Sequence, residues 1–434
     1  MEPLFRAALL LCCITPAAFR QRELHSEECV IELHCEECVP EHMPLVTSHR
    51  AADGRVTLRA GEVVALSCGR GRLAAFPAQG QLLVMCEAGR YRVPGGSLRH
   101  ILELGCQEDV FEDVLHMVEH CAPPLQGRAY RTAEGEGARH LATVCFDPDR
   151  GVAVHALAAG ARRLALPPHA ERAAPLSLLG NFGHMFDAGT RAAAERLYGD
   201  DAHTNRRLRE IVKHDGVSLA DQTLTAARLL SPLYFDDQDV RVADFASNKV
   251  AAWRSVAAGN LRHVQRDVAR ALAPASAGRR VLAGTHGVAA LRTDHNATEI
   301  YLKGSRFPVP KYIWTVLVEG ERALAVLVLN DPFVAVSEVR AAVLCASQCA
   351  RVAWLRETRR ARRYETPLLG LTFCCGVHEA AAAVPEIPRA ALQAVPPGDA
   401  GLLTDLDDEP DLVDVQSLVV VRSNRKKIIS APAS

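Results

Sequence analysis

The sequence predicts an α+β fold with a mostly antiparallel sheet, preceded by a β-rich module that is cross-linked by disulfides. Before residue 150, short segments alternate between apolar and polar residues. After residue 190, apolar residues recur with helical spacing, and the cysteines lie towards both ends of the chain. The 434 residues are 49% hydrophobic with a formal net charge of −1. This composition is typical of a folded globular chain, and any binding to nucleic acid would need a local basic patch.

The first residues are typical of a signal peptide, which we place at residues 1–19. Arg6 precedes the apolar run Ala7–Ala18, which ends in small residues and is too short to cross a bilayer. A buried N-terminal helix is the alternative. We therefore expect a secreted, extracellular protein with no membrane association, and the sequon at Asn296 is a predicted glycosylation site.

Twelve cysteines follow the expected leader. An even number behind a signal peptide favours disulfides in an oxidising compartment, although spacing does not assign the partners. The pair in His34-Cys35-Glu36-Glu37-Cys38 leaves zinc as an alternative, but a structural zinc site usually has a second such pair. The disulfide candidates are Cys29, Cys35, Cys38, Cys68, Cys86, Cys106, Cys121, Cys145, Cys345, Cys349, Cys374 and Cys375.

We expect a cysteine-containing β-rich module over residues 27–150, a larger domain over 151–390, and a linker and tail over 391–434. Within the module, alternation on both sides of Ala60-Gly61 predicts a hairpin over Arg55–Cys68. The segments Gln81–Cys86 and Gly89–Val93 are expected to be further short strands.

The larger domain mixes helices and strands. Helical spacing of apolar residues predicts helices over Thr190–Leu197, Thr204–Val212 and Arg254–Leu272. The expected strands are Arg280–Thr285, Ala297–Leu302, Tyr312–Val318 and Ala323–Asn330, with a further short strand at Leu418–Arg422 in the tail. Because Ala323–Asn330 is almost unbroken apolar sequence, we expect a central, buried strand there.

Several stretches, taken in order, resemble the secreted arthropod form of the DNA/RNA non-specific endonuclease family. The resemblance covers roughly residues 27 to 390. The stretches that carry it are Gly284–Val288, Glu299–Leu302, Phe307–Trp314, Val326–Phe333, Cys345–Cys349 with Trp354-Leu355, Cys374–Val377, and the module's Cys86, Cys106, Cys121 and Cys145–Asp147.

The resemblance implies a ββα-metal nuclease core within an endonuclease-like domain at 151–390. Such proteins hydrolyse DNA and RNA with one Mg²⁺, a general-base His in an Arg-Gly-His motif, an Asn that holds the metal and a Glu that anchors its water shell. Phosphodiester cleavage needs such a proton acceptor and a hard cation with oxygen ligands.

This chain departs from that pattern at the positions of the base, the metal-binding Asn and the Glu. The Arg-Gly-His motif falls on Asp221, Gln222 and Thr223, so that Thr223 stands at the base position. An intermediate Asn survives as Asn248, whereas Gln265 replaces the Glu. Ala257 replaces the metal-binding Asn, and its methyl group cannot ligate a cation.

The resemblance therefore implies a nuclease homologue that has lost its ordinary chemistry. A neutral hydroxyl is a poor proton acceptor, and a positioned base is worth about 10²–10⁴-fold in rate. Mg²⁺ is expected as cofactor only if the protein is active. The alternative is a displaced site, with His214 or His263 as the base and Asp244 or Asp267 as a metal ligand.

Two basic clusters are candidates for contacts with DNA or RNA. The first is Arg206, Arg207, Arg209 and Lys213, for which a solvated helix face is the favoured interpretation. In the second, Trp354 and Tyr364 interleave with Arg351, Arg356, Arg359, Arg360, Arg362 and Arg363. Phosphate contacts by such residues would give salt-dependent affinity without sequence preference. We single out Arg207, Arg356, Arg359 and Arg360.

Three functions follow. The first is a secreted, catalytically impaired homologue that retains nucleic-acid binding. The second is an active Mg²⁺-dependent endonuclease with a displaced site, and the third is an extracellular binding protein without nucleic-acid affinity. The sequence does not indicate the oligomeric state.

Overall fold

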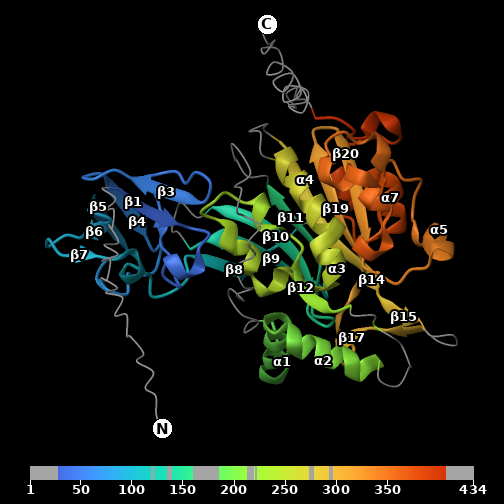
Figure 1. The fold of residues 1–434 in the computed structure, drawn as a ribbon, viewed down its shortest axis with the longest axis horizontal. Helices are drawn as coiled ribbons and strands as arrows, with labels where there is room; N and C mark the ends of the chain where they lie inside the picture. The colour runs from blue at the N-terminus through green and yellow to red at the C-terminus, as the bar shows by residue number, and fades with distance from the viewer. Residues whose placement is uncertain are drawn as a thin grey trace, which may run out of the picture.

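The computed structural model has two lobes that β8 (Phe111–Leu115) joins (Figure 1). The structure describes residues 28–118, 121, 123–133, 139–159, 185–212, 219, 222–272, 278–292 and 297–406. The predicted signal peptide, Leu418–Arg422, Asn296, His214, Lys213 and Asp221 lie outside these residues. The predicted fold class is confirmed: helices and mostly antiparallel sheets follow a disulfide-linked β-rich lobe.

The N-terminal lobe holds two small antiparallel sheets. In the first, β1 (Cys29–Glu32) pairs with β3 (Arg55–Leu58). The second has the order β2-β4-β5-β6-β7, with β2 (Leu45–Val46), β4 (Val63–Ser67), β5 (Gln81–Glu87), β6 (Arg90–Arg92) and β7 (Leu98–Arg99). The predicted hairpin over 55–68 is therefore wrong, because the turn after β3 carries the chain into the other sheet.

An eight-stranded antiparallel sheet forms the centre of the larger lobe. Its order is β21-β20-β19-β14-β11-β10-β9-β8. The strands are β9 (Gln126–Thr132), β10 (His140–Asp147), β11 (Val152–Ala159), β14 (Arg280–Val288), β19 (Pro310–Glu319), β20 (Arg322–Leu329) and β21 (Thr372–Cys375). The sheet begins at Phe111, so it includes β8–β10 from the segment that we assigned to the N-terminal module.

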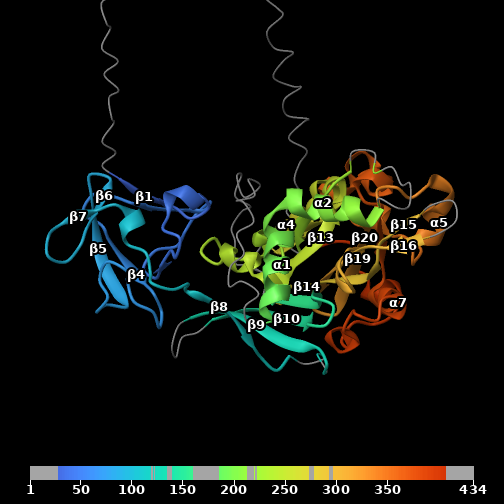
Figure 2. The same ribbon diagram turned by 90° about the horizontal axis from the view of Figure 1, so that it is seen from below.

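Both faces of this sheet are buried at β19 and β20, which explains the unbroken apolar run of β20. Successive side chains of a strand point to opposite faces, and β19 sends Ile313 and Leu317 to one core and Trp314 and Val316 to the other. Helices α1 (Ala188–Gly199), α2 (Asp201–Val212) and α4 (Arg262–Leu272) cover one face, and α7 (Val377–Ala383) lies on the opposite face (Figure 2).

The helices largely follow the predicted positions. They are α1 (Ala188–Gly199), α2 (Asp201–Val212), α3 (Arg254–Val256), α4 (Arg262–Leu272), α5 (Val339–Ala342), α6 (Arg356–Arg359) and α7 (Val377–Ala383). The helix expected over 254–272 is broken at Gly259, whose φ of −92° and ψ of −122° are not helical. A Cβ at Gly259 would lie 2.7 Å from the Leu369 carbonyl oxygen, so only glycine permits this close crossing.

One expected strand divides into two. Ala297–Leu302 becomes β16 (Ala297–Glu299), which pairs with β15 (Ala290–Arg292), and β17 (Tyr301–Lys303), which pairs with β18 (Arg306–Pro308). The chain changes partners at Ile300, whose N–H donates to Ala289 and whose carbonyl accepts from Val309. The apolar pattern continues through this point because Ile300 is buried.

All twelve cysteines of the residues that the structure describes form disulfides, as the even count predicts. The pairs are Cys29–Cys86, Cys35–Cys38, Cys68–Cys106, Cys121–Cys145, Cys345–Cys375 and Cys349–Cys374. Because Cys35 and Cys38 are bonded to each other, this oxidised form offers no thiolate for the zinc alternative.

Residues 229–248 connect β12 to β13 and dock onto the N-terminal lobe. The Gln238 side chain accepts from the Val46 N–H at 3.1 Å and donates to the His49 carbonyl at 3.2 Å. The Asp237 carboxylate accepts from the Gly54 N–H at 3.2 Å. This connection therefore fixes one lobe against the other.

Asn330, at the end of β20, ties the central sheet to the strand pair of β12 (Leu224–Arg228) and β13 (Lys249–Trp253). Its Oδ1 accepts from the Trp253 N–H at 3.0 Å, and its Nδ2 donates to the Pro310 carbonyl at 2.9 Å. The side chain is fully buried. The position of β13 therefore depends on this amide.

We expect Asn330→Ala to lower the free energy of unfolding by about 1–3 kcal/mol, because it leaves buried backbone groups unpaired. Urea denaturation followed by circular dichroism measures this change. Ser305→Ala, at an exposed turn, is the control and should change stability by less than about 0.5 kcal/mol. Equal effects of the two substitutions would contradict the role of Asn330.

Candidate functional site

The chain forms two antiparallel strands followed directly by a helix, the local order that the resemblance implied. Leu224 of β12 faces Trp253 of β13, and the helix begins at Arg254. The Arg254 N–H donates to the Thr223 carbonyl at 2.7 Å, which brings the start of β12 against the start of the helix. The predicted site residues are therefore placed around one ββα unit.

Thr223, at the predicted base position, lies in an arginine–aspartate contact. Arg254 Nε donates to Thr223 Oγ1 at 3.3 Å, and its Nη2 lies 2.5 Å from Asp201 Oδ2. Thr225 Oγ1 also donates to Asp201, at 3.0 Å. A cationic donor already occupies the Thr223 hydroxyl, which disfavours any role for it as a proton acceptor.

Ala257 and Gln265 offer nothing to a cation. The Ala257 methyl packs against the hydrophobic core. Gln265 Nε2 donates to the Arg228 carbonyl at 2.9 Å and so joins α4 to the end of β12. The side chain thus acts as a link between a helix and a strand.

Asn248 is fully buried, and its amide is used internally. Its Oδ1 accepts from the Leu230 N–H at 2.9 Å, while its Nδ2 donates to the carbonyls of Leu230 and Ala243 at 2.9 and 2.8 Å. These bonds close the connection between β12 and β13. The amide therefore holds the loop that docks the N-terminal lobe.

Asp244, one of the two alternative ligands, is paired with cations of the protein. It contacts Arg228, and Lys249 Nζ lies 3.0 Å from its Oδ1. Lys249 is fully buried, and this burial lowers its pKa to about 8, although the Asp244 charge favours the ammonium form. The carboxylate thus balances the charges of the buried Lys249 and the partly buried Arg228.

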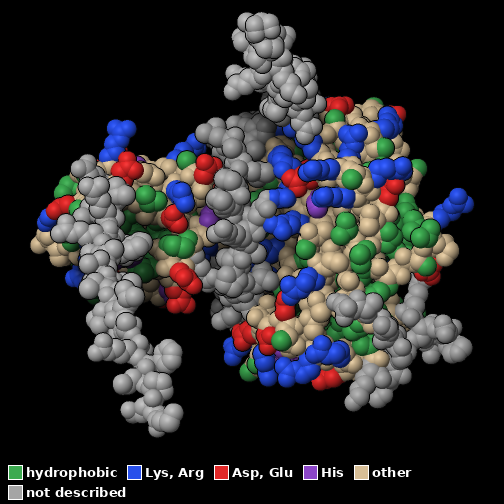
Figure 3. Space-filling model, viewed as in Figure 1, with side chains coloured by type: hydrophobic (Ala, Val, Ile, Leu, Met, Phe, Trp, Pro, Cys, Tyr) green, Lys and Arg blue, Asp and Glu red, His purple; other side chains and the backbone are tan. Residues whose placement is uncertain are grey.

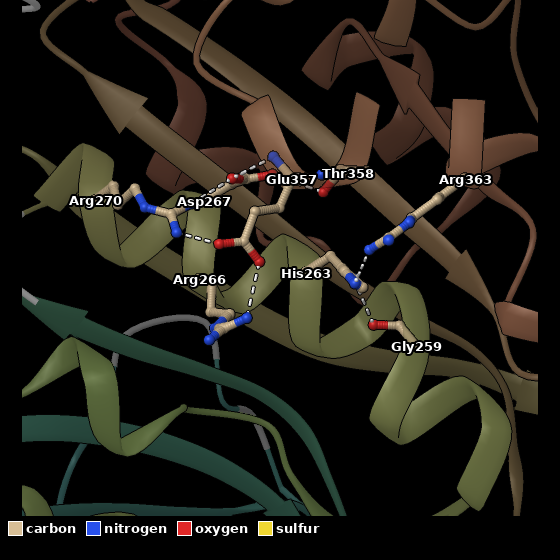
Figure 4. A network of polar contacts seen from close by, with 8 residues as sticks. All are labelled: Gly259, His263, Arg266, Asp267, Arg270, Glu357, Thr358 and Arg363. Atoms are coloured by element: carbon tan, nitrogen blue, oxygen red, sulfur yellow. Dashed lines mark hydrogen bonds and ion pairs between the residues drawn. The ribbon is translucent and has the colours of Figure 1, made fainter. Parts of the chain in front are cut away.

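Asp267, the other alternative ligand, is fully buried beneath α6 (Figure 4). Its carboxylate accepts from the N–H groups of Glu357 and Thr358 at 3.0 and 2.9 Å and from the Thr358 hydroxyl at 2.8 Å. Arg270 Nη1 lies 3.0 Å from it. Burial raises the pKa of Asp267, and these hydrogen bonds oppose the rise. Asp267 thus anchors the arginine-rich segment 356–363 to α4.

His263 connects α4 to the same segment. Its Nδ1 lies 3.2 Å from the Gly259 carbonyl, and Arg363 Nη1 lies 2.8 Å from its Nε2 (Figure 4). A carbonyl accepts and a guanidinium donates, so both contacts are satisfied only by a neutral ring with its proton on Nδ1. Burial lowers the pKa of His263, and among its charged neighbours Glu357 opposes this while Arg363, Arg262 and Arg270 reinforce it.

Residues 262–272 and 356–363 form what we call the arginine surface. Together they carry eight arginines and two carboxylates, of which Asp267 is buried. Glu357 contacts Arg266 at 3.0 Å and also Arg270. Although burial raises the pKa of Glu357, the Arg270 hydrogen bond and charge hold it below its usual value. The arginine surface is therefore strongly basic in a chain of nearly zero net charge.

The singled-out arginines differ in exposure. Arg356 and Arg360 are exposed, whereas Arg359 is partly buried and donates to the Val352 carbonyl at 2.9 Å. Arg207, on α2, is also partly buried and contacts the Leu302 carbonyl and Glu210. Trp354, which the sequence interleaves with the arginines, is buried and donates to the Leu403 carbonyl, so it cannot stack on a ligand.

Both basic clusters appear on one side of the molecule. Figure 3 shows Lys and Arg side chains gathered over α4 and the region beside it, and again over α2. In the same orientation, β12 and the start of α3 lie between these elements (Figure 1). The predicted site is thus flanked by basic surface.

The described residues at the ββα unit do not fit a Mg²⁺ ion. Hard cations take oxygen ligands, but Ala257 has none, and the side chains of Thr223, Gln265, Asn248 and Asp267 are engaged within the protein. Within the described part of the chain, the side chains that cluster as potential metal ligands are Glu32, Cys35 and Cys38, in the other lobe.

Sequence reasoning did not find the Arg254–Asp201 pair or the anchoring role of Asp267. Arg254 begins the helix that the sequence predicts over residues 254–272 and that carries Ala257, so its proximity to the site could have been inferred. Asp201 approaches from a separate helix, and only the folded arrangement shows this contact.

No protein-family model matches the chain, and a comparison with curated proteins finds no match. Among solved structures, the chain is similar to one from the crystal structure of the EndoG/EndoGI complex, which concerns the mechanism of EndoG inhibition. The similarity covers 44% of this chain and 71% of that chain, with 10% sequence identity and a TM-score of 0.26. A similarity of this size assigns neither a family nor an activity. No helix among the described residues is long and apolar enough to cross a membrane.

The His263–Arg363 contact predicts a pH-dependent contribution to stability. Because the folded-state pKa of His263 lies below its ordinary value of about 6.5, its contribution is fully present above that value. It is lost as the pH falls through the lowered folded-state pKa, where the unfolded chain binds more protons.

Urea denaturation of the wild type and His263→Gln between pH 8 and pH 4.5 isolates this contribution. We expect the wild type to lose more stability on acidification than the variant, which cannot titrate at this position. Parallel pH profiles would show that His263 is not held neutral by the fold.

Proposed function

We propose that the chain is a nuclease-type homologue that does not hydrolyse phosphodiesters with Mg²⁺ and that binds DNA or RNA through the arginine surface. The proposal rests on one observation, which is that the side chains at the predicted site are already engaged in contacts within the protein. Every described side chain at the sequence-predicted catalytic positions either lacks a donor atom or makes a contact within the protein. A basic surface lies on the helix that continues from this unit.

Several features support a role for the arginine surface in binding phosphate groups. Asp267 and Glu357 hold the segment 356–363 against α4, so little ordering remains to be done on binding. Arginine's guanidinium fork matches phosphate oxygens. The neutral state of His263 leaves the arginines as the source of positive charge there, and such a surface would recognise backbone phosphates in either DNA or RNA.

A second function, a secreted Mg²⁺-dependent endonuclease, depends on a displaced base such as His214, which lies outside the described part of the chain. An extracellular binding protein without nucleic-acid affinity remains the third hypothesis. Secretion and glycosylation at Asn296 stay predictions, and six disulfides agree with an oxidising environment.

We expect purified protein to show no Mg²⁺-dependent cleavage of plasmid DNA or of RNA. Loss of a positioned base alone removes about 10²–10⁴-fold in rate. The assay compares Mg²⁺ with EDTA at equal ionic strength, and Thr223→Ala should leave the background rate unchanged. Rapid Mg²⁺-dependent digestion that copurifies with the folded protein would refute this half of the proposal.

We expect the protein to bind labelled duplex DNA with an affinity that falls as NaCl rises, measured by fluorescence anisotropy. The double variant Arg356→Glu/Arg360→Glu should reduce the slope of log affinity against log salt by about 0.9 for each phosphate that the protein then leaves unneutralised. The control Arg59→Glu/Arg70→Glu makes the same charge change at exposed positions of the N-terminal lobe. Equal weakening by both double variants would show that net charge, rather than this surface, governs binding.

A further inference from the structure

The Cys35–Cys38 disulfide differs from the other five in exposure and in loop size. Neither Cys35 nor Cys38 is buried, whereas each other disulfide contains at least one buried cysteine. Its sequence separation is 3, against separations of 24 to 57 in the others. The bond therefore connects neighbouring residues on the surface and does not join distant strands.

Because neither cysteine is buried, a reducing thiol can reach this bond, and because its loop is short, opening it costs the fold little. A disulfide stabilises a fold more when it closes a longer loop, so opening this one removes the smallest constraint. Exchange with an external thiol also requires access to sulfur. The lobe should accordingly keep its fold when this bond alone is open, because Cys29–Cys86 and Cys68–Cys106 still cross-link it.

A carboxylate lies beside this pair. Glu32 Oε2 is 4.0 Å from Cys38 Sγ, while Arg55 Nη2 lies 2.9 Å from the other oxygen, Oε1, and orients the group. Ligand atoms of Glu32, Cys35 and Cys38 all lie within 4.8 Å of one another. Two sulfurs and one carboxylate oxygen therefore converge at one point on the surface.

The spacing suits a tetrahedral zinc ion once the sulfurs separate. With Zn–S near 2.3 Å and Zn–O near 2.1 Å, the sulfur and carboxylate ligand atoms of a tetrahedral site lie about 3.6–3.8 Å apart. The Cys35 and Cys38 Cα atoms are 5.1 Å apart, which allows the side chains to reach this separation by rotation. The Glu32–Cys38 distance of 4.0 Å needs only a small shift.

We propose that reduction of the Cys35–Cys38 disulfide creates a Zn²⁺ site formed by both cysteines and Glu32, with solvent as the fourth ligand. An external dithiol supplies two electrons and two protons, becomes a disulfide itself, and leaves two thiols on the protein. Zinc then binds the two thiolates and displaces their protons to solvent. The oxidised protein has no such site, so zinc binding reports the redox state of this pair.

The test begins with limited reduction by dithiothreitol, followed by anaerobic removal of the reductant. Alkylation and peptide mass spectrometry should find two free thiols, at Cys35 and Cys38. Titration with Zn²⁺ against a chromophoric chelator should then give one ion per chain. Co²⁺ in place of Zn²⁺ should show thiolate-to-cobalt charge-transfer absorption, which the oxidised protein lacks.

Three variants define the ligands. Cys38→Ser should abolish binding, and Glu32→Gln should weaken it at least tenfold, about the loss seen when even an outer partner of a ligand is removed. Glu37→Gln removes an equal charge from an exposed neighbour and should weaken binding by less than about threefold, because solvent screens that charge.

Opening of another disulfide before this one, or no zinc binding by protein with free thiols at 35 and 38, would overturn the proposal. Equal affinities of Glu32→Gln and Glu37→Gln would also overturn it, since Glu32 would then not be a ligand. None of these outcomes depends on nucleic-acid binding.

Discussion

The buried carboxylate of Asp267 determines the arrangement of the candidate binding surface. It accepts hydrogen bonds from two backbone N–H groups and one hydroxyl of the segment that carries five arginines. These bonds hold positively charged side chains close together on α4, against their mutual repulsion. An acid that could have served as a metal ligand is thereby used to organise cations.

Other side chains around the ββα unit are likewise used for contacts within the protein. Gln265 joins α4 to β12, Thr223 receives the Arg254 guanidinium, and Ala257 fills a place in the core. Each of these side chains, at the positions that the resemblance singles out, makes an internal contact. A polar group left unpaired at these positions would be destabilising.

The sequence predicted the positions of helices and strands better than it predicted which strands pair. Apolar spacing located α1, α2, β14, β19 and β20, since period and burial depend on neighbouring residues in the chain. It could not show that β3 pairs with β1 instead of β4, because strand pairing is a property of the folded lobe. Gly259 breaks a helix whose apolar pattern continues past it, and the cause is Leu369, more than a hundred residues away.

For the site, the resemblance indicated which positions lack a base or a metal ligand, but not which contacts their side chains make. A resemblance aligns positions, and Thr223 or Ala257 can be recognised at once as lacking a base or a ligand. The identity of Asp201 as the partner of Arg254 required the packing of α2 against β12, which no local pattern contains. Trp354 illustrates the opposite error, since its position among arginines suggested exposure while the fold buries it.

Asn248 shows how the two lobes and the ββα unit are connected. Its amide closes the connection from Leu230 to Ala243, and within that connection Asp237 and Gln238 hold the N-terminal lobe. The Asn248 side chain thus stabilises the connection that fixes one lobe on the other. Since the amide is fully buried and its hydrogen bonds are internal, its role in this fold is structural.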